Sequence, residues 1–184
     1  MPNKPVVRSR RFVKDTGVFR VEEMDLKFAN GETRVYQRLL GSSRGAVMVV
    51  PLLDRETVLL IREYAAGMDR YELGFVKGRI ESGEDLLEAA NREMQEEVGY
   101  AARRLDPVRS VTVAPGYLLH STHIVLARGL YAKRLPGDEP EPIEVVPWKL
   151  NELDSLLQRD DFTESRSITA FYLVRELLAR ENRN

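Results

Sequence analysis

Three glutamates close the most acidic stretch of this 184-residue chain. Glu93, Glu96 and Glu97 end the segment GRIESGEDLLEAANREMQEEVGY, which runs from Gly78 to Tyr100. On a helix they occupy positions i, i+3 and i+4, so their side chains are neighbours on one surface. Three carboxylates that close repel one another and raise at least one pKa unless a cation lies among them. The spacing therefore indicates a site for a divalent cation.

Composition limits the kind of ion and the kind of partner. The chain has no cysteine and two histidines, so oxygen ligands must dominate, and these favour Mg²⁺, with Mn²⁺ as a second candidate. Lys and Arg number 28 against 29 Asp and Glu, which gives no reason to expect a nucleic-acid partner. No apolar run has the length of a signal peptide or of a membrane span. We therefore expect a cytoplasmic protein with no membrane partner.

A helix over residues 83–98 is predicted to carry the three acids, with the Ser82 hydroxyl as its N-cap. On a helical wheel Glu97 falls inside the apolar arc and Glu93 at its edge, whereas Glu96 lies on the outer side. A carboxylate in a buried stripe is costly unless it is paired. A solvated acidic face, the usual fate of a charge run, therefore explains Glu96 but not Glu97.

The N-terminal part reads as a β-sheet of its own. Apolar and polar positions alternate between Phe12 and Leu40 and predict a meander of about three strands, with a hairpin signal at Asn30-Gly31. The stretch GSSRG, residues 41–45, reads as a hinge. We therefore place an N-terminal β subdomain at residues 1–44 and a second domain at residues 45–184.

The second domain mixes strands and helices around the acidic segment. Two apolar runs predict buried strands at residues 46–53 and 57–62, which we expect to pair as a hairpin. Further strands are predicted at 71–76, 108–113, 122–126 and 143–148, a short helix at 150–158 and an amphipathic closing helix at 167–180. These elements would supply the core that positions the acidic helix.

A second acidic cluster, GDEPEP, occupies residues 137–142. Its two prolines restrict the backbone to extended conformations, so we expect a loop there.

The acidic segment resembles a known motif. Gly78, five residues, Glu84, seven residues and then REMQEEVGY from Arg92 to Tyr100 resemble the Nudix box at every fixed position. Only Tyr100 is unusual, where a smaller aliphatic residue is commoner. The upstream ELGFVKG, the PGY at residues 115–117, the acidic loop and the closing helix resemble the ADP-ribose pyrophosphatase branch of the Nudix hydrolases. The similarity covers nearly the whole chain.

That resemblance implies a fold and a reaction. The fold class would be α/β, a Nudix α/β/α sandwich with an N-terminal antiparallel β subdomain. The reaction would be Mg²⁺-dependent hydrolysis of the pyrophosphate bond in ADP-linked compounds (ADP-ribose, NADH, diadenosine polyphosphates), giving AMP plus the other phosphate. The family also implies a homodimer, with the strands of residues 1–44 exchanged or packed across the interface and helping to shape both sites.

The resemblance gives roles to residues of the box. Glu93 and Glu97 would be metal ligands, Glu96 a ligand to a further ion, and the Lys77 carbonyl could complete a coordination shell. Arg92 would orient the glutamates by ion pairing. Independently, the helical wheel places Glu93 and Glu97 at the buried edge.

The resemblance also gives structural roles to one glycine and one glutamate of the box. Gly78 would permit a tight turn of the loop, and Glu84 would brace that loop against the helix.

The acidic loop would complete the site. Position by position, Glu139 resembles the general base of the ADP-ribose branch, and Glu141 a partner on the metal side. Glu96 is the competing base, and an ordinary acidic surface loop is an equally weighted alternative.

Three residues could contact substrate. Arg34 and Arg38 could reach a phosphate across a dimer. The alternative is that they are ordinary solvent-exposed arginines on a strand. Tyr117 could stack on a base or be a core aromatic. Ala65 stands where many ADP-ribose pyrophosphatases carry arginine, which loosens the case for ADP-ribose as sole substrate. The alternatives are hydrolysis of another nucleoside diphosphate sugar, such as ADP-glucose or GDP-mannose, or a non-catalytic nucleotide-binding regulator.

Overall fold

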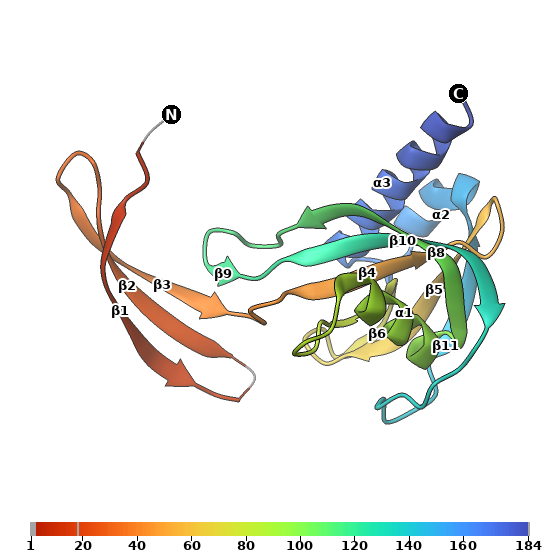
Figure 1. Cartoon of the computed structure of the whole chain (residues 1–184), viewed down its shortest axis with the longest axis horizontal. Coiled ribbons are helices and arrows are strands. Elements are labelled where there is room, and N and C mark those ends of the chain that lie inside the picture. Colours follow the sequence, from red (N-terminus) through yellow and green to blue (C-terminus); the bar gives the residue numbers. More distant parts are fainter. Residues whose placement is uncertain (1–2, 18, 184) are drawn as a thin grey trace. The chain divides into compact units, whose positions relative to one another are not determined.

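The computed structural model describes residues 3–17 and 19–183, and Figure 1 labels their elements. Contacts divide the chain into two units: unit 1, residues 1–45 with 112–121, and unit 2, residues 46–111 with 122–184. The segment 112–121, which we placed in the second domain, belongs to unit 1. It does so because β9 (Leu118–Leu119) pairs in parallel with β3 (Thr33–Leu40).

Unit 1 is built on a four-stranded sheet in the order β1-β2-β3-β9. Its first strands, β1 (Val6–Asp15) and β2 (Arg20–Lys27), pair antiparallel with each other, and β2 pairs antiparallel with β3. The predicted meander of three strands is confirmed, but it begins at Val6 and not at Phe12. At the turn between β2 and β3, Gly31 has a φ of 89°, a conformation that glycine adopts without a steric penalty. The Asn30 side chain accepts a hydrogen bond from Glu32 N at 3.1 Å. The predicted hairpin signal is confirmed.

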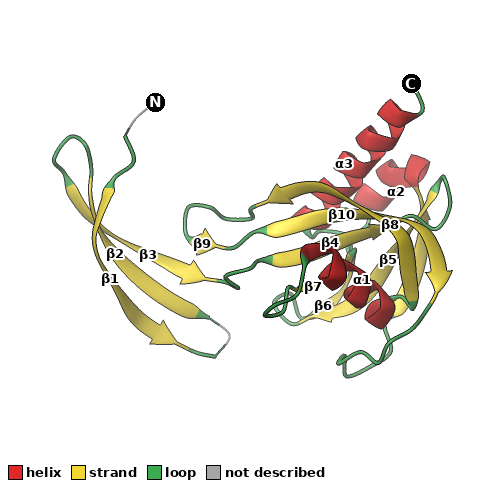
Figure 2. Ribbon diagram, in the orientation of Figure 1, coloured by secondary structure: helices red, strands yellow, loops and turns green. Residues whose placement is uncertain are grey.

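Unit 2 contains two sheets, in the orders β7-β4-β10-β8 and β11-β5-β6, whose strands Figure 2 shows in yellow. The strands are β4 (Ala46–Pro51), β5 (Thr57–Ala65), β6 (Arg70–Gly74), β7 (Val76–Arg79), β8 (Tyr100–Val111), β10 (Thr122–Ala132) and β11 (Glu144–Lys149).

The predicted β4–β5 hairpin is wrong. β4 pairs with β7 and, in parallel, with β10, whereas β5 pairs with β6 and β11. A single bridge, Leu52 to Val58, joins the ends of the two strands. Every residue of β4 and the first five residues of β5 are buried. A strand that is buried in this way needs hydrogen-bond partners for its backbone on both edges. Each of the two strands therefore lies in the interior of its own sheet.

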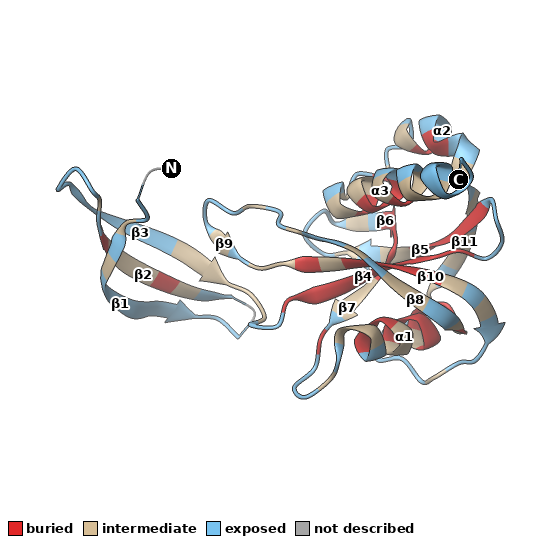
Figure 3. Ribbon diagram, turned by 45° about the horizontal axis from the view of Figure 1, so that its top comes forward, coloured by how far each residue is buried: buried red, intermediate tan, exposed pale blue. Residues whose placement is uncertain are grey.

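Helices cover the two sides of these sheets. Figure 3 shows α1 (Leu86–Glu97) on one side and α2 (Leu153–Leu157) with α3 (Ser165–Glu181) on the other. A short 3₁₀ turn, Leu150–Glu152, precedes α2. The α/β/α sandwich is therefore confirmed. Among the described residues, no helix is long and apolar enough to cross a membrane.

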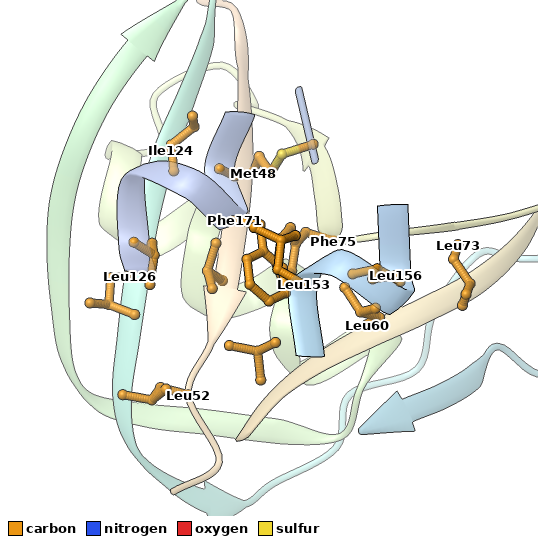
Figure 4. Packing of buried hydrophobic residues seen from close by; sticks show 14 of the residues in the cluster. Met48, Leu52, Leu60, Leu73, Phe75, Ile124, Leu126, Leu153, Leu156 and Phe171 are labelled. Carbon is orange, nitrogen blue, oxygen red and sulfur yellow. The ribbon is translucent and has the colours of Figure 1, made fainter. Parts of the chain in front are cut away.

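Two apolar clusters fill the sandwich. Figure 4 shows the first, in which Met48 and Leu60 of the strands pack with Phe75, Phe171 and the residues of α2 and α3. The second packs the opposite side of the same strands, through Val47 and Leu59, against α1. Alternate side chains of one strand thus serve both clusters, and α1 is held firmly against the sheets.

The N-cap of α1 differs from the prediction. Asp85, not Ser82, caps the helix: its carboxylate accepts from Leu87 N at 2.8 Å, and the Glu88 carboxylate accepts from Asp85 N at 3.1 Å. This reciprocal pair is a capping box, which satisfies two free N–H groups where a serine hydroxyl alone satisfies one. The helix therefore begins three residues later than predicted, at Leu86.

Candidate active site

The helix α1 turns two of its three clustered acids into the protein. Glu93 is 9% exposed and Glu97 is 6% exposed, although both carry carboxylates. When side chains alone are compared, Glu96 is 21% exposed and Glu93 is 12% exposed. The wheel had predicted this division, and the structure confirms it.

Gly78 makes room for Glu93. It lies in β7, paired with Val47 of β4, so its predicted role in a tight turn is wrong. A Cβ added at Gly78 would lie 1.8 Å from Oε1 of Glu93, far inside van der Waals contact. A larger residue at this position would force the Glu93 carboxylate to move, because that carboxylate occupies the space beside the strand.

Arg92 is the centre of an ion-pair network. Its guanidinium contacts Oε1 of Glu84 at 2.8 Å and Oε1 of Glu93 at 2.9 Å. It also donates to Oε2 of Glu96 at 2.8 Å and to the main-chain oxygen of Arg79 at 3.0 Å. The hydrogen bonds to Glu84 are the main reason that the pKa of Arg92 is raised. The expected ion pairing by Arg92 and bracing by Glu84 are thus confirmed, while a catalytic role for Arg92 stays a prediction.

Burial favours the neutral forms of the two inward acids. Desolvation raises the pKa of Glu97 to about 9; nearby Lys77 opposes this shift, and Glu63 and Glu93 add to it. Desolvation also raises the pKa of Glu93, against the attraction of Arg92. A bound cation would favour the ionised forms and reverse both shifts. The two acids are therefore suited to a positive ligand.

The acids open onto a cavity of about 840 Å³. Its walls are β7, α1 and the segment of residues 136–143, which is a loop as predicted and bends at residues 140 and 141. Leu135 N donates to the main-chain oxygen of Gln95 at 3.1 Å and so ties the start of the loop to α1. Further along, Tyr71 Oη donates to Oε1 of Glu141 at 2.5 Å.

This cavity brings together the predicted metal and catalytic residues. They are Lys77, Arg92, Glu93, Glu96, Glu97, Glu139 and Glu141.

Glu139 has the electrostatic surroundings of a base. Desolvation raises the pKa of its carboxyl, the charges of Glu63 and Asp138 add to this, and Lys77 opposes it. A base with a raised pKa accepts a proton more readily near neutral pH. The predicted role of Glu139 is compatible with this position and stays a prediction.

The donor set fits a hard cation in kind. In residues 3–17 and 19–183, no three acidic, histidine or cysteine side chains are gathered tightly enough to hold an ion. Mutual repulsion opposes such a cluster without a cation, and Glu93 and Glu96 turn to Arg92 instead. The candidate metal ligands are nevertheless all oxygen atoms, and two of them belong to the buried carboxylates of Glu93 and Glu97. This is the chemistry that Mg²⁺ prefers.

The three predicted substrate contacts lie in unit 1. Arg34 pairs with Glu32 at 2.7 Å, and Arg38 pairs with Glu22 at 2.6 Å. Tyr117 is exposed, not a core aromatic. Both arginines thus have partners within unit 1, and the three substrate roles stay predictions.

The sequence reasoning missed one ion pair at the site. The Lys77 ammonium pairs with Glu63 of β5, and both side chains are mostly buried. A signal was present, because a lysine inside the apolar run GFVKG is unusual for a buried strand end. Only its main-chain carbonyl had been considered.

Comparison with known protein families decides the assignment. The NUDIX domain matches residues 42–171, and the NudE-type Nudix hydrolase N-terminal domain matches residues 5–38. The chain belongs to the Nudix hydrolase family. Nudix hydrolases generally use a divalent metal ion, and the predicted family is confirmed. The N-terminal match groups the chain with the NudE-type members of that family.

Relatives of known name agree with the assignment. The chain is 46% identical to the ADP compounds hydrolase NudE of Escherichia coli (strain K12) over 180 residues, 98% of this chain and 96% of that protein. It is 30% identical to the ADP-sugar pyrophosphatase of Mus musculus over 193 residues, 94% of this chain and 88% of that protein. The crystal structure of an ADP compounds hydrolase superposes with a TM-score of 0.92 at 44% identity, covering 100% of this chain and 99% of that one. The chain is therefore a Nudix pyrophosphohydrolase.

Proposed function

We propose that this Nudix hydrolase cleaves the pyrophosphate bond of ADP-linked compounds with Mg²⁺ and releases AMP plus the other phosphate. The observation that carries the proposal is the pair of buried carboxylates, Glu93 and Glu97, facing a cavity whose other wall is the acidic loop. The names of the relatives support ADP-linked substrates. ADP-ribose, NADH and diadenosine polyphosphates are the candidates.

Five residues would hold the ion or ions. Glu93 and Glu97 would bind through their inward carboxylates, and Glu96, Glu141 and the Lys77 carbonyl would add further oxygens. Bound Mg²⁺ neutralises phosphate charge and acts as a Lewis acid. Mn²⁺, with similar oxygen preference, would substitute.

The chain's own residues would do the rest of the chemistry. Arg92 holds the Glu93 and Glu96 carboxylates at 2.9 and 2.8 Å, which fixes their direction before substrate arrives. Glu139, with its raised pKa, would take the proton of the attacking water. Glu96 remains the competing base, although its carboxylate already accepts a hydrogen bond from Arg92.

A homodimer also belongs to the proposal. In the described part of unit 1 the strands carry large apolar side chains open to solvent, with Phe12 70% exposed. An antiparallel sheet normally buries one face, and a second copy of residues 1–44 would cover it. Sedimentation of the wild type and of Phe12→Ser tests this, with a dimer and a weakened dimer expected. Roles for Arg34, Arg38 and Tyr117 in substrate binding, and a cytoplasmic location, complete the proposal.

A hydrolysis panel tests the function directly. The purified chain is offered ADP-ribose, NADH, diadenosine triphosphate, ADP-glucose and GDP-mannose with Mg²⁺ in ¹⁸O-labelled water. AMP should appear from the first three, and the label identifies the attacked phosphorus. Preferred cleavage of GDP-mannose would move the assignment to another nucleoside diphosphate sugar. Absence of turnover with every compound, with and without Mn²⁺, would contradict the proposal.

A further inference from the structure

The Lys77 side chain is a cation held inside the cavity by a partner of its own. Lys77 lies on β7 between Val76 and Gly78, and its side chain is 25% exposed. Its ammonium pairs with the carboxylate of Glu63, which is 26% exposed. Neither group extends freely into solvent, so the position of the ammonium is defined by the fold.

The pair leaves donor capacity unused. A lysine ammonium carries three N–H donors. Within the described part of the chain, Glu63 is its one hydrogen-bond acceptor. Two donors thus remain for a ligand, and donors to charged oxygens form strong hydrogen bonds.

The other cations that line the cavity are less suited to bind a ligand. Arg92 already donates to Glu84, to Glu96 and to the main-chain oxygen of Arg79. Arg79 and Arg134 are exposed side chains that form no ion pair with any described residue. An exposed arginine must give up rotamer freedom to bind, whereas Lys77 is already ordered.

The ammonium also lies between the two acidic walls. Lys77 N donates to Oε2 of Glu97 at 3.4 Å, so the residue adjoins α1. Lys77 also lines the same cavity as Glu139 of the loop. A diphosphate that contacts both walls would pass this position.

We propose that the Lys77 ammonium donates to a non-bridging phosphoryl oxygen of the bound diphosphate, with Glu63 as the positioning residue that holds it there. The inference rests on the proposed function, because it concerns the diphosphate of that substrate. A compact point charge suits a tetrahedral phosphate, which presents oxygens in several directions.

Four variants separate this role from charge balance. Lys77→Met keeps most of the stem and removes the charge, and Lys77→Arg keeps the charge. The double variant Lys77→Met with Glu63→Gln removes both members of the pair, so no carboxylate is left uncompensated. Arg134→Ala, an exposed cation on the same cavity, is the control.

Two measurements are made on each full-length protein at fixed free Mg²⁺. The first is kcat and KM with ADP-ribose. The second is calorimetric binding of a methylene-bridged ADP-ribose analogue, which does not depend on turnover. Melting temperatures are measured to check that each variant is folded. If Lys77→Met does not fold, the double variant provides the test.

The expected result is a loss of about 10- to 100-fold in analogue affinity and in kcat/KM for Lys77→Met, the value of one hydrogen bond to a charged group. The double variant should be equally impaired, and Lys77→Arg should retain more. Arg134→Ala should change either quantity by less than about threefold, as for other exposed charges.

Two outcomes would overturn the inference. Recovery of wild-type binding in the double variant would show that Lys77 only neutralises Glu63. Equal losses in Arg134→Ala and Lys77→Met would show that only the total positive charge matters. Failure of the proposed function looks different, because the wild type itself would then neither cleave ADP-ribose nor bind the analogue.

Discussion

The cavity has two acidic walls that are built differently. On α1, Glu93 and Glu97 are buried, with Gly78 and Arg92 leaving the Glu93 carboxylate one place to lie. On the loop of residues 137–142 the acids are exposed, and their one hydrogen bond to a side chain in the described residues is Tyr71 to Glu141. The helix wall is fixed in advance, and the loop wall is held by few contacts.

This difference suits the two walls to different tasks. Fixed, desolvated carboxylates are appropriate for an ion, whose ligands must be ready at set positions. A proton acceptor must instead come within hydrogen-bond reach of water after substrate has bound, which a loop with few contacts permits. We therefore expect variants of the helix wall to remove the reaction and variants of the loop wall to slow it.

The largest effect is expected from Glu97→Gln. Loss of a metal-binding carboxylate should lower turnover by about 10³-fold, since metal charge supplies several kcal/mol to the transition state. The fold should survive, because glutamine resembles the neutral glutamic acid that burial favours. Steady-state kinetics with ADP-ribose and Mg²⁺ measure it.

Glu88→Gln is the matched control for that change. It replaces an exposed glutamate of the same helix and keeps a capping-box side chain, so activity should be unchanged. Full Mg²⁺-dependent activity in Glu97→Gln would show that Glu97 is not needed to bind the metal ion.

Glu139→Gln is expected to lower kcat by about 10²-fold, the usual contribution of a general base. The raised pKa of Glu139 should give the wild type an acid limb in its pH–rate profile, and the variant should lose that limb. Asp138→Asn serves as the neighbouring control. If Glu96→Gln removes the acid limb of the pH–rate profile and Glu139→Gln does not, the general base lies on the helix wall. The proposed division of tasks between the two walls would then be wrong.

Gly78→Ala tests how rigidly the helix wall is held. The new Cβ would overlap Glu93, at 1.8 Å from Oε1, so the carboxylate must move, and we expect about 10- to 100-fold lower activity with a lower melting temperature. Gly67→Ala is the control, because nothing lies within 4 Å of its added Cβ. Equal effects of the two substitutions would show that Glu93 moves aside without cost.

The last prediction concerns stability in EDTA. Burial holds the pKa of Glu97 at about 9 in the folded protein, against 4.5 as its ordinary value. The unfolded chain therefore releases a proton that the folded protein keeps, and stability should fall as pH rises from about 5 to 9.

Melting temperatures across this range should show the decline. The slope should be shallower in Glu97→Gln and unchanged in Asp138→Asn, an acid of the exposed loop. Parallel slopes in all three proteins would mean that burial does not raise the pKa of Glu97.

Much of the site could be predicted because its signal is local. The division of Glu93 and Glu97 from Glu96 follows from helical periodicity alone, and the burial confirms it. The errors concern choices between partners. Ser82 and Asp85 both offer a cap, and only the reciprocal bond with Glu88 selects Asp85. The expected β4–β5 hairpin likewise depended on adjacency in sequence, whereas β4 pairs with the distant β10 and β5 with the distant β11.

The Nudix family, the acidic helix and the acidic loop can be recognised in the amino-acid sequence, because each depends on spacing along a few residues. The role of Gly78 beside Glu93 and the pairing of Glu63 with Lys77 became visible only in the folded protein. Both features depend on β7, α1 and β5 meeting in space. Local spacing carries no information about such encounters, since packing of the whole core sets which side chains share one volume.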